Sequence, residues 1–247
     1  DYYFEIHSGG ICCYFNKKGP ARDLEPFFNY KVTPGFSTPD WAKGAVFYQI
    51  YVDRFANGDP SNDVLNREYI YIKEPSKKID DWYCYPEQMD VRNFYGGDLQ
   101  GVLDHLDYLK ELGVDVIYLN PIFVSPSNHK YDIQDYDYID PHYGKIVVDE
   151  GNTLPDWENN NMNASKYISR VTDKRNLEAS NEFFVHFVEE VHKKGMRVIL
   201  DGVFNHCGSF NKWMDAERIY ENQYGYEKGA FVDANSPYRH FFKFYNQ

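Results

Sequence analysis

Short apolar runs divide the part of the chain that follows Trp41. Three of these runs have the length and composition of buried β-strands, namely Val46–Val52, Val114–Leu119 and Met196–Leu200. Long polar stretches follow the first and the second run, and a polar stretch also follows the third. The pattern therefore predicts three buried strands separated by long connections.

Two amphipathic helices are predicted between these strands. The first begins at Asp98, places apolar residues at helical spacing on one face, and ends at Gly113. The second covers Asn181–Lys194 and ends at Gly195. Each helix is joined to the next strand by a very short turn, so the order is strand, loop, helix, strand, loop, helix, strand.

This order is typical of a parallel α/β sheet. The connections that lead from strand to helix are tens of residues long, and loops of that length in a compact domain are usually functional. In a (β/α)₈ barrel such loops form the site at the carboxyl ends of the strands. A doubly wound sheet would carry a glycine-rich turn after its first strand. Because Val52–Phe55 (VDRF) is no such turn, we favour a (β/α)₈ TIM barrel.

The segment before Trp41 is predicted to be separate from the barrel. Tyr2–Ile6 and Ile11–Phe15 are β-prone and flank a Gly-Gly turn, which indicates a hairpin. Two strands alone are marginal in water, so we interpret the hairpin as the end of a small β-sandwich domain. Residues 16–40 are rich in proline and are interpreted as a linker.

Only about three barrel strands are predicted in residues 41–247, whereas a barrel of this type needs eight. We expect no fourth strand in the last forty residues. A three-stranded parallel sheet has open edges and should not be stable alone. We therefore expect the rest of the barrel to come from a polypeptide that continues beyond Gln247 or from a second chain, which leaves a homodimer among the open alternatives.

Composition and charge limit the classes of molecule that this chain could bind. The formal net charge of the 247 residues is -12, which argues against a nucleic-acid partner. No apolar run is long enough to span a membrane. Aromatic residues make up 18% of the chain, and their rings either form the core or stack on sugars. The sequence begins without Met or a leader and looks trimmed; it does not fix the compartment, although we favour the cytoplasm over secretion.

The four cysteines show neither a C-x-x-C pair nor a zinc-site spacing, so buried free thiols are expected. Cys12 and Cys13 are adjacent in a predicted strand and should face opposite ways.

Polar side chains gather in the predicted loops. Asp201, Asn205 and His206 follow the third strand, and the alternative to a site is a polar turn with a capping Asn. His129 and Tyr131 follow the second strand, where Tyr131 could stack on a sugar.

The loop after the first strand is rich in oxygen ligands. It holds Asn57, Asp59, Asn62 and Asp63, and the alternative to a Ca²⁺ site is an ordinary Asx-rich turn. Gly96 and Asp98 could add a carbonyl and a carboxylate, although Asp98 is also well placed as a helix N-cap.

Together these motifs resemble the α-amylase family, glycoside hydrolase family thirteen. Asp201–His206 (DGVFNH) matches the D-x-V-x-N-H pattern of its first conserved region. Val46–Phe55 resembles its first strand, Gly113–Pro121 its second, and His129–Tyr131 the loop that follows. The loop ligands and the hairpin resemble the neopullulanase, cyclomaltodextrinase and maltogenic amylase branch, and Asn205–Lys212 is similar to bacterial amylopullulanases.

The resemblance implies roles for these residues. Tyr131 would stack on the sugar at the cleavage subsite, His206 would hydrogen-bond a sugar hydroxyl, and Asp201 would hold the neighbouring catalytic groups. His129 would lie beside them in the substrate site. The remaining residues would bind Ca²⁺ and fix the first loop: Asn57, Asp59, Asn62, Asp63, Gly96 and Asp98.

The resemblance also implies retaining hydrolysis of α-1,4 and, in some members, α-1,6 glucosidic bonds of starch-type glucans, pullulan or maltooligosaccharides. The family nucleophile lies in a G-x-R-x-D stretch, which does not occur in these 247 residues. No nucleophile or acid is therefore assigned, and we expect both to lie beyond Gln247. The chain would run from the front of the barrel into the subdomain after strand three. The alternative is a non-catalytic, α-glucosidase-like carbohydrate-binding or scaffold protein.

Overall fold

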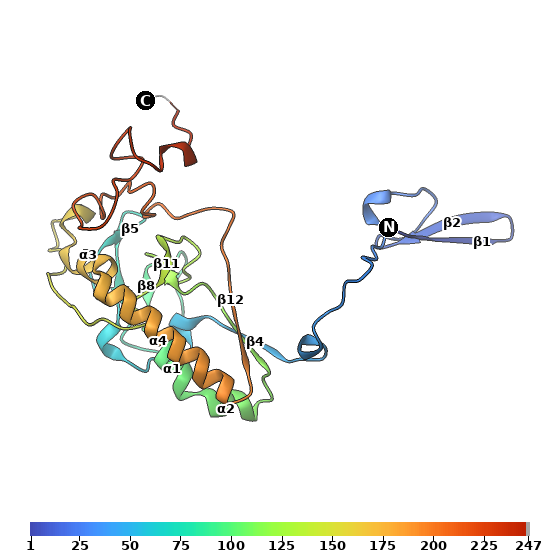
Figure 1. The fold of residues 1–247 in the computed structure, drawn as a ribbon, viewed down its shortest axis with the longest axis horizontal. Coiled ribbons are helices and arrows are strands. Elements are labelled where there is room, and N and C mark those ends of the chain that lie inside the picture. The colour runs from blue at the N-terminus through green and yellow to red at the C-terminus, as the bar shows by residue number, and fades with distance from the viewer. Residues whose placement is uncertain (246–247) are drawn as a thin grey trace. The chain divides into compact units, whose positions relative to one another are not determined.

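The structure is a computed structural model that describes residues 1–245 (Figure 1). Gln247, beyond which the nucleophile and the acid are expected, lies outside the described residues, so the structure does not test that expectation. The chain divides into two compact units, one formed by Asp1–Gly44 and the other beginning at Ala45.

The first unit is a small antiparallel sheet. β1 (Phe4–Ser8) pairs with β2 (Ile11–Asn16), which confirms the predicted hairpin, and β2 also pairs with β3 (Gly19–Ala21). The interpretation of residues 16–40 as a linker missed β3, which Gly19 allows by turning the chain at a φ of 96°. The 3₁₀ helices η1 (Pro26–Phe28) and η2 (Asp40–Ala42) follow.

The second unit is built on the predicted parallel sheet. Its strands are β4 (Phe47–Ile50), β9 (Val116–Leu119) and β12 (Arg197–Leu200), in the order β12-β9-β4. Both pairs are parallel and without a register shift, so Ile50, Leu119 and Leu200 lie level with one another. The three predicted strands and their parallel order are confirmed.

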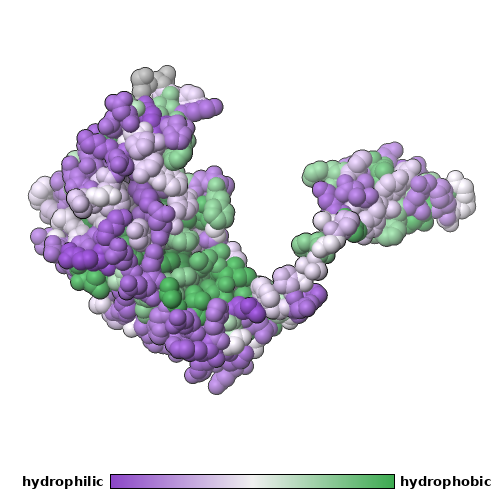
Figure 2. Space-filling view, viewed as in Figure 1, coloured by the Kyte–Doolittle hydropathy of each residue, from purple (hydrophilic) through white to green (hydrophobic). Residues whose placement is uncertain are grey.

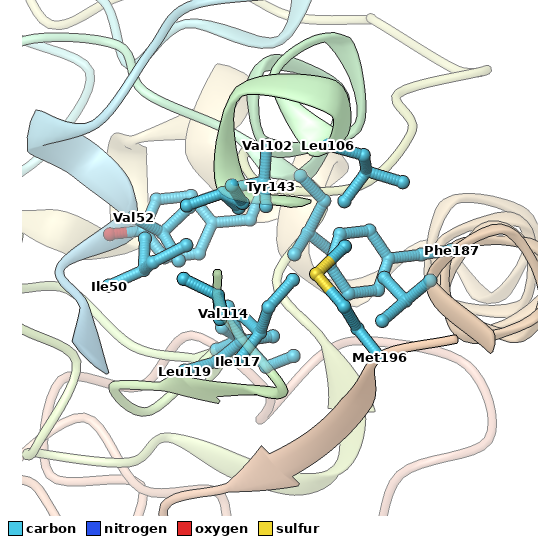
Figure 3. Packing of buried hydrophobic residues seen from close by; sticks show 14 of the residues in the cluster. Ile50, Val52, Val102, Leu106, Val114, Ile117, Leu119, Tyr143, Phe187 and Met196 are labelled. Atoms are coloured by element: carbon cyan, nitrogen blue, oxygen red, sulfur yellow. The ribbon is translucent and has the colours of Figure 1, made fainter. Parts of the chain in front are cut away.

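One face of this sheet packs against helices. Ile50, Ile117 and Leu119 are buried in a cluster that includes residues of α1 (Leu99–Asp104), α2 (Leu106–Glu111) and α4 (Lys174–Lys193), as Figure 3 shows for Leu106 and Phe187. The other face is less covered: Phe47 is 47% exposed. Figure 2 shows an apolar area over this part of the unit.

Two helices differ from the prediction. The helix predicted from Asp98 is divided at His105 into α1 and α2, and the imidazole Nδ1 of His105 lies 2.8 Å from the Gly101 carbonyl oxygen. The helix predicted from Asn181 begins earlier, at Lys174, where the Asp173 carboxylate accepts a hydrogen bond from the Arg175 N–H. The extra turns were missed because their buried residues are partly polar.

The long connections contain short elements that the sequence did not reveal. α3 covers Ser165–Thr172, and η5 covers Asn161–Asn163. After β12, the residues up to 245 form turns and η6 (Arg239–Phe241), without a further strand. The remaining elements are η3 (Val52–Arg54), η4 (Pro60–Asn62), β5 (Ile70–Tyr71), β6 (Glu74–Pro75), β7 (Lys77–Lys78), β8 (Asn93–Phe94), β10 (Phe123–Val124) and β11 (Asp135–Ile139).

A second buried cluster, rich in tyrosine and phenylalanine, lies among these loops. Tyr69 and Tyr167 are fully buried with ring centroids 4.0 Å apart, and Phe210 packs against both. The tyrosines of this cluster therefore form a core and not a surface. In the described part of the chain, no helix has the length and apolarity needed to cross a membrane.

Candidate functional site

Three loops begin at the same edge of the parallel sheet. Because Ile50, Leu119 and Leu200 are level, the residues after each strand emerge side by side. The Gln49 amide donates a hydrogen bond to the Asn120 side-chain oxygen (2.6 Å), which joins the ends of the first two strands. The predicted gathering of loops at one edge is therefore present.

Asp201 and Tyr131 meet at this edge. The Tyr131 hydroxyl donates a hydrogen bond to Oδ2 of Asp201 at 2.7 Å, although the two residues are 70 positions apart. Burial and the nearby Asp201 carboxylate raise the pKa of Tyr118 on β9. Burial and the neighbouring Asp201 carboxylate raise the pKa of Tyr131 to about 12. Tyr131 is therefore a neutral phenol at physiological pH.

His129 supports Tyr131 from within the same loop. Its Nδ1 accepts a hydrogen bond from the Tyr131 N–H (3.1 Å) and lies 3.2 Å from the Ser127 hydroxyl. The two rings lie 6.0 Å apart between centroids at an angle of 32°. Burial lowers the pKa of His129, so the neutral imidazole is favoured.

His206 does not join this group through its side chain. The imidazole is exposed and, within residues 1–245, makes no hydrogen bond or ring contact with Tyr131. Its main-chain carbonyl accepts a hydrogen bond from the Tyr136 hydroxyl (2.6 Å). His206 also lines a cleft of about 480 Å³ whose wall includes Tyr136 and Trp213, which are stacked with centroids 5.4 Å apart.

A buried charged network, which sequence reasoning missed, lies directly beside Tyr131. The Lys130 ammonium is only 1% exposed and donates to Oδ2 of Asp140 (2.6 Å) and to the Ser125 carbonyl (2.9 Å). Lys130 has a φ of 61°, an uncommon conformation for a non-glycine residue. The ion pair therefore fixes the backbone turn from which Tyr131 projects.

The network continues across the molecule. The ring nitrogens of His142 lie 2.8 Å from Asp140 Oδ1 and 2.8 Å from Glu68 Oε1. Arg170 on α3 donates to Glu68 Oε2 at 2.9 Å. No local sequence signal indicated this network, because its members lie in three separate segments.

The predicted cation ligands lie together around Asp98. The Asp98 carboxylate accepts hydrogen bonds from the N–H groups of Gly58 (3.1 Å), Asp59 (2.8 Å) and Gly101 (2.6 Å). The Asn62 amide donates to the same carboxylate at 3.2 Å. Asp98 is therefore the N-cap of α1 and also an anchor for the loop.

Two oxygens of this cluster lack donors. Oδ1 of Asn57 and Oδ1 of Asn62 are buried without a hydrogen bond, whereas Oδ1 of Asp63 accepts from the Asn57 amide (2.8 Å) and its Oδ2 lies 2.5 Å from the Lys78 ammonium. Buried oxygens without donors are uncommon and indicate an unseen water or cation. Gly96 closes the site: a Cβ there would collide with Oδ1 of Asp63.

Charge at the cluster is only partly compensated. Lys145 lies 2.9 Å from Oδ2 of Asp59, and hydrogen bonds from Ser61 and Lys145 outweigh burial and lower the pKa of Asp59. Burial raises the pKa of Asp63 despite Lys78, and burial also raises the pKa of Asp98. The carboxylates would gain from a cation that met the unpaired oxygens, so these residues fit a hard cation such as Ca²⁺.

Comparisons with known proteins agree on one family. The model of the α-amylase catalytic domain matches residues 49–150 and 179–247. An amylopullulanase from Thermoanaerobacter thermohydrosulfuricus is 36% identical over 91% of this chain, and neopullulanase 2 from Thermoactinomyces vulgaris is 40% identical over 81%. The chain spans 14% and 27% of the length of these two relatives.

A solved structure gives the same result. The cyclic α-maltosyl-(1→6)-maltose hydrolase from Arthrobacter globiformis, in its ligand-free form, superimposes with a TM-score of 0.54 at 33% sequence identity. The match covers 84% of this chain and 33% of that enzyme.

Proposed function

Because this chain belongs to the α-amylase family, we propose that it forms the sugar-contacting front part of a glycosidase that cleaves α-glucosidic bonds. The substrates would be starch-type glucans, pullulan or maltooligosaccharides, hydrolysed at α-1,4 and, in some cases, α-1,6 bonds with retention. The names of the relatives, which include an amylopullulanase and a neopullulanase, support this substrate class. The fold would be a (β/α)₈ barrel to which β4, β9 and β12 contribute.

One observation carries the proposal: Tyr131 and Asp201 meet at the carboxyl edge of two adjacent parallel strands. A phenol whose hydroxyl is fixed by a carboxylate presents a held ring, which suits stacking on a pyranose. We assign Tyr131 as the stacking residue, His206 as a donor to a sugar hydroxyl, and His129 as the residue that positions Tyr131. Asp201 would orient both Tyr131 and the neighbouring catalytic groups.

The carboxylate pair of retaining hydrolysis is not assigned within these residues. Retaining glycosidases use two carboxyl groups about 5–5.5 Å apart, one as nucleophile and one as acid. Asp201 accepts a hydrogen bond from the Tyr131 hydroxyl, so its carboxylate serves as an acceptor and we do not assign it as the nucleophile. We propose that the pair is supplied by residues beyond Gln247 or by a second chain.

We also propose that the first loop binds Ca²⁺. Asn57 and Asn62 would contribute the oxygens that lack donors, and Asp59, Asp63, Asp98 and the Gly96 carbonyl would complete an all-oxygen set. Bound calcium would fix the loop, and would take no part in bond cleavage.

Substitution of Tyr131 in the active enzyme that carries this chain tests the proposed site. Tyr131→Ala should lower kcat/KM for maltooligosaccharides roughly 10- to 100-fold, because both the stacked ring and its hydrogen bond are lost. Tyr131→Phe keeps the ring and should lose about tenfold or less. Steady-state kinetics on maltotriose and longer chains measure both effects.

Tyr108→Ala on the surface of α2 is the matched control, because Tyr108 is 51% exposed and lies outside the loops. It should retain the kinetics of the unsubstituted enzyme. Unchanged kcat/KM in Tyr131→Ala would contradict the sugar-site assignment and would favour a scaffold role.

A further inference from the structure

The hairpin of the first unit brings three metal-binding side chains together. Glu5 and His7 alternate on β1 and therefore share one face, and Cys12 on β2 is the register partner of His7. Nε2 of His7 lies 2.7 Å from Oε1 of Glu5, and Sγ of Cys12 lies 3.6 Å from the same oxygen. Within residues 1–245, this is the only group of three Cys, His, Asp or Glu side chains whose donor atoms all lie within 4.8 Å of one another.

The two faces of the hairpin differ in character. Phe4, Ile6 and Phe15 share the opposite, apolar face with Cys13, which pairs with Ile6. Phe4 and Phe15 both pack against Tyr30 on that side. The prediction that the adjacent cysteines face opposite ways is confirmed, and only Cys12 lies on the face that carries Glu5 and His7.

The chemistry of the three donors is that of a zinc site. Thiolate sulfur, imidazole nitrogen and carboxylate oxygen bind Zn²⁺ at about 2.0–2.3 Å. We propose that Glu5, His7 and Cys12 bind a thiophilic divalent cation such as Zn²⁺, with water completing a tetrahedral site. The donors already lie close enough that side-chain rotation suffices to surround an ion.

Binding of a divalent cation would release the Cys12 thiol proton, because the thiolate is the ligand. This site is chemically distinct from the oxygen-only loop around Asp98, because calcium does not favour thiolate.

A metal ion at this site would stabilise the hairpin of the first unit. Asn16 is the only buried residue among the first 44, so apolar packing within these residues does little to hold β1 against β2. An ion held by β1 and β2 together would cross-link the hairpin.

Cobalt titration of the reduced full chain, in excess Ca²⁺, tests the proposal. One equivalent of Co²⁺ should produce a thiolate-to-cobalt absorption band, and Zn²⁺ should remove it. Cys12→Ser should abolish the band, and His7→Gln should weaken Co²⁺ affinity at least tenfold. Cys13→Ser is the matched control, since it removes the neighbouring thiol on the apolar face, and it should bind within about twofold of the unsubstituted chain.

A second readout does not depend on any substitution. Zn²⁺ should slow iodoacetamide alkylation of Cys12 but not that of the exposed Cys84, as mapped by mass spectrometry. Absence of a cobalt band in the unsubstituted chain, its persistence in Cys12→Ser, or equal Zn²⁺ protection of Cys84 would each overturn the proposal.

Discussion

At the residue scale, two kinds of buried oxygen lie side by side in the first loop. The Asp98 oxygens are satisfied by N–H groups of Gly58, Asp59 and Gly101. The side-chain oxygens of Asn57 and Asn62 have no donor. The first kind stabilises the loop with or without a cation, whereas the second kind is stabilised only when a cation or water is bound.

Asp63 and Asp98 should differ in what they contribute to stability without calcium. The unsubstituted chain should melt at a higher temperature in Ca²⁺ than in chelator, and Asp63→Asn should lose most of that difference. Asp98→Ala should lose that difference as well, because Asp98 is also a proposed ligand, and should in addition lower Tm by several degrees in chelator, because the cap of α1 is worth about 1 kcal/mol and the loop bonds are lost. Differential scanning fluorimetry with Ca²⁺ or EGTA measures both.

Asp156→Asn serves as the control, since the Asp156 side chain is fully exposed. It should keep the whole calcium-dependent shift. A shift in Asp63→Asn equal to that of the unsubstituted chain would remove Asp63 from the proposed ligand set.

The role of a single residue could be predicted from the sequence where its contacts are with residues close to it in the chain. Asp98 precedes a helix in the sequence, so its capping role followed from position alone. Lys130 was not predictable as a buried cation, because its burial depends on Asp140, ten residues away across the β10–β11 pair. The meeting of Tyr131 with Asp201 was inferred only through the family resemblance and the common edge of the sheet.

At the element scale, α1 docks unusually closely on the first loop. A Cβ at Gly101 would overlap the Ala56 carbonyl oxygen, and one at Gly97 would overlap that of Val52. Both contacts are with backbone, which cannot move aside as a flexible side chain does. The position of α1 therefore requires these glycines.

For Gly101→Ala, the sign of the change in the free energy of unfolding tests this close contact. In an exposed helix this change stabilises by about 1 kcal/mol, because alanine has the higher helix propensity. In α1 it should instead destabilise the chain by about 2 kcal/mol or more, since the added methyl group overlaps the Ala56 carbonyl. Urea unfolding followed by circular dichroism measures the difference.

Gln100→Ala, on the neighbouring and partly exposed position of α1, should change stability by less than about 0.5 kcal/mol. A stabilised Gly101→Ala variant would show that α1 does not lie against the loop at residue 56.

Elements were predictable where apolar spacing marked the buried face. The inward side of α4 around Phe187 and Val191 follows that rule. α3 and the first turns of α4 were missed because they bury polar groups, including Arg170 and Asn176, which satisfy their hydrogen bonds in tertiary contacts. Apolar periodicity alone gives a weakened signal for such a helix, because part of its buried face is polar.

At the scale of the whole second unit, one buried network joins three segments. Glu68 comes from the first loop, His142 from the connection after β11, and Arg170 from α3. Through Asp140, the network also reaches Lys130 beside the proposed sugar site. Removal of one partner of such a network leaves buried charge uncompensated.

The charge states of His142, Glu68 and Asp140 determine how the stability contributed by this network changes with pH. Burial alone would lower the pKa of His142, but the flanking Glu68 and Asp140 carboxylates raise it above its ordinary value. Its stabilising contribution is therefore complete below about pH 6.5 and is lost as pH rises through the folded-state pKa. Despite burial, the cations hold the pKa values of Asp140 and Glu68 low, so their contribution is lost in acid.

We therefore expect stability to be greatest in mildly acidic to neutral solution and to fall toward alkaline pH. His142→Gln should lower the free energy of unfolding by about 3–5 kcal/mol at pH 6, because the carboxylates of Glu68 and Asp140 lose the imidazolium between them. This loss of unfolding free energy in His142→Gln should become smaller as pH rises, because His142 of the unsubstituted chain then loses its positive charge as well.

His186→Gln, at an exposed position of α4, should change stability by less than about 0.5 kcal/mol at any pH. Urea unfolding from pH 6 to pH 9 distinguishes the cases, and a deficit independent of pH would mean that His142 is neutral in the folded chain.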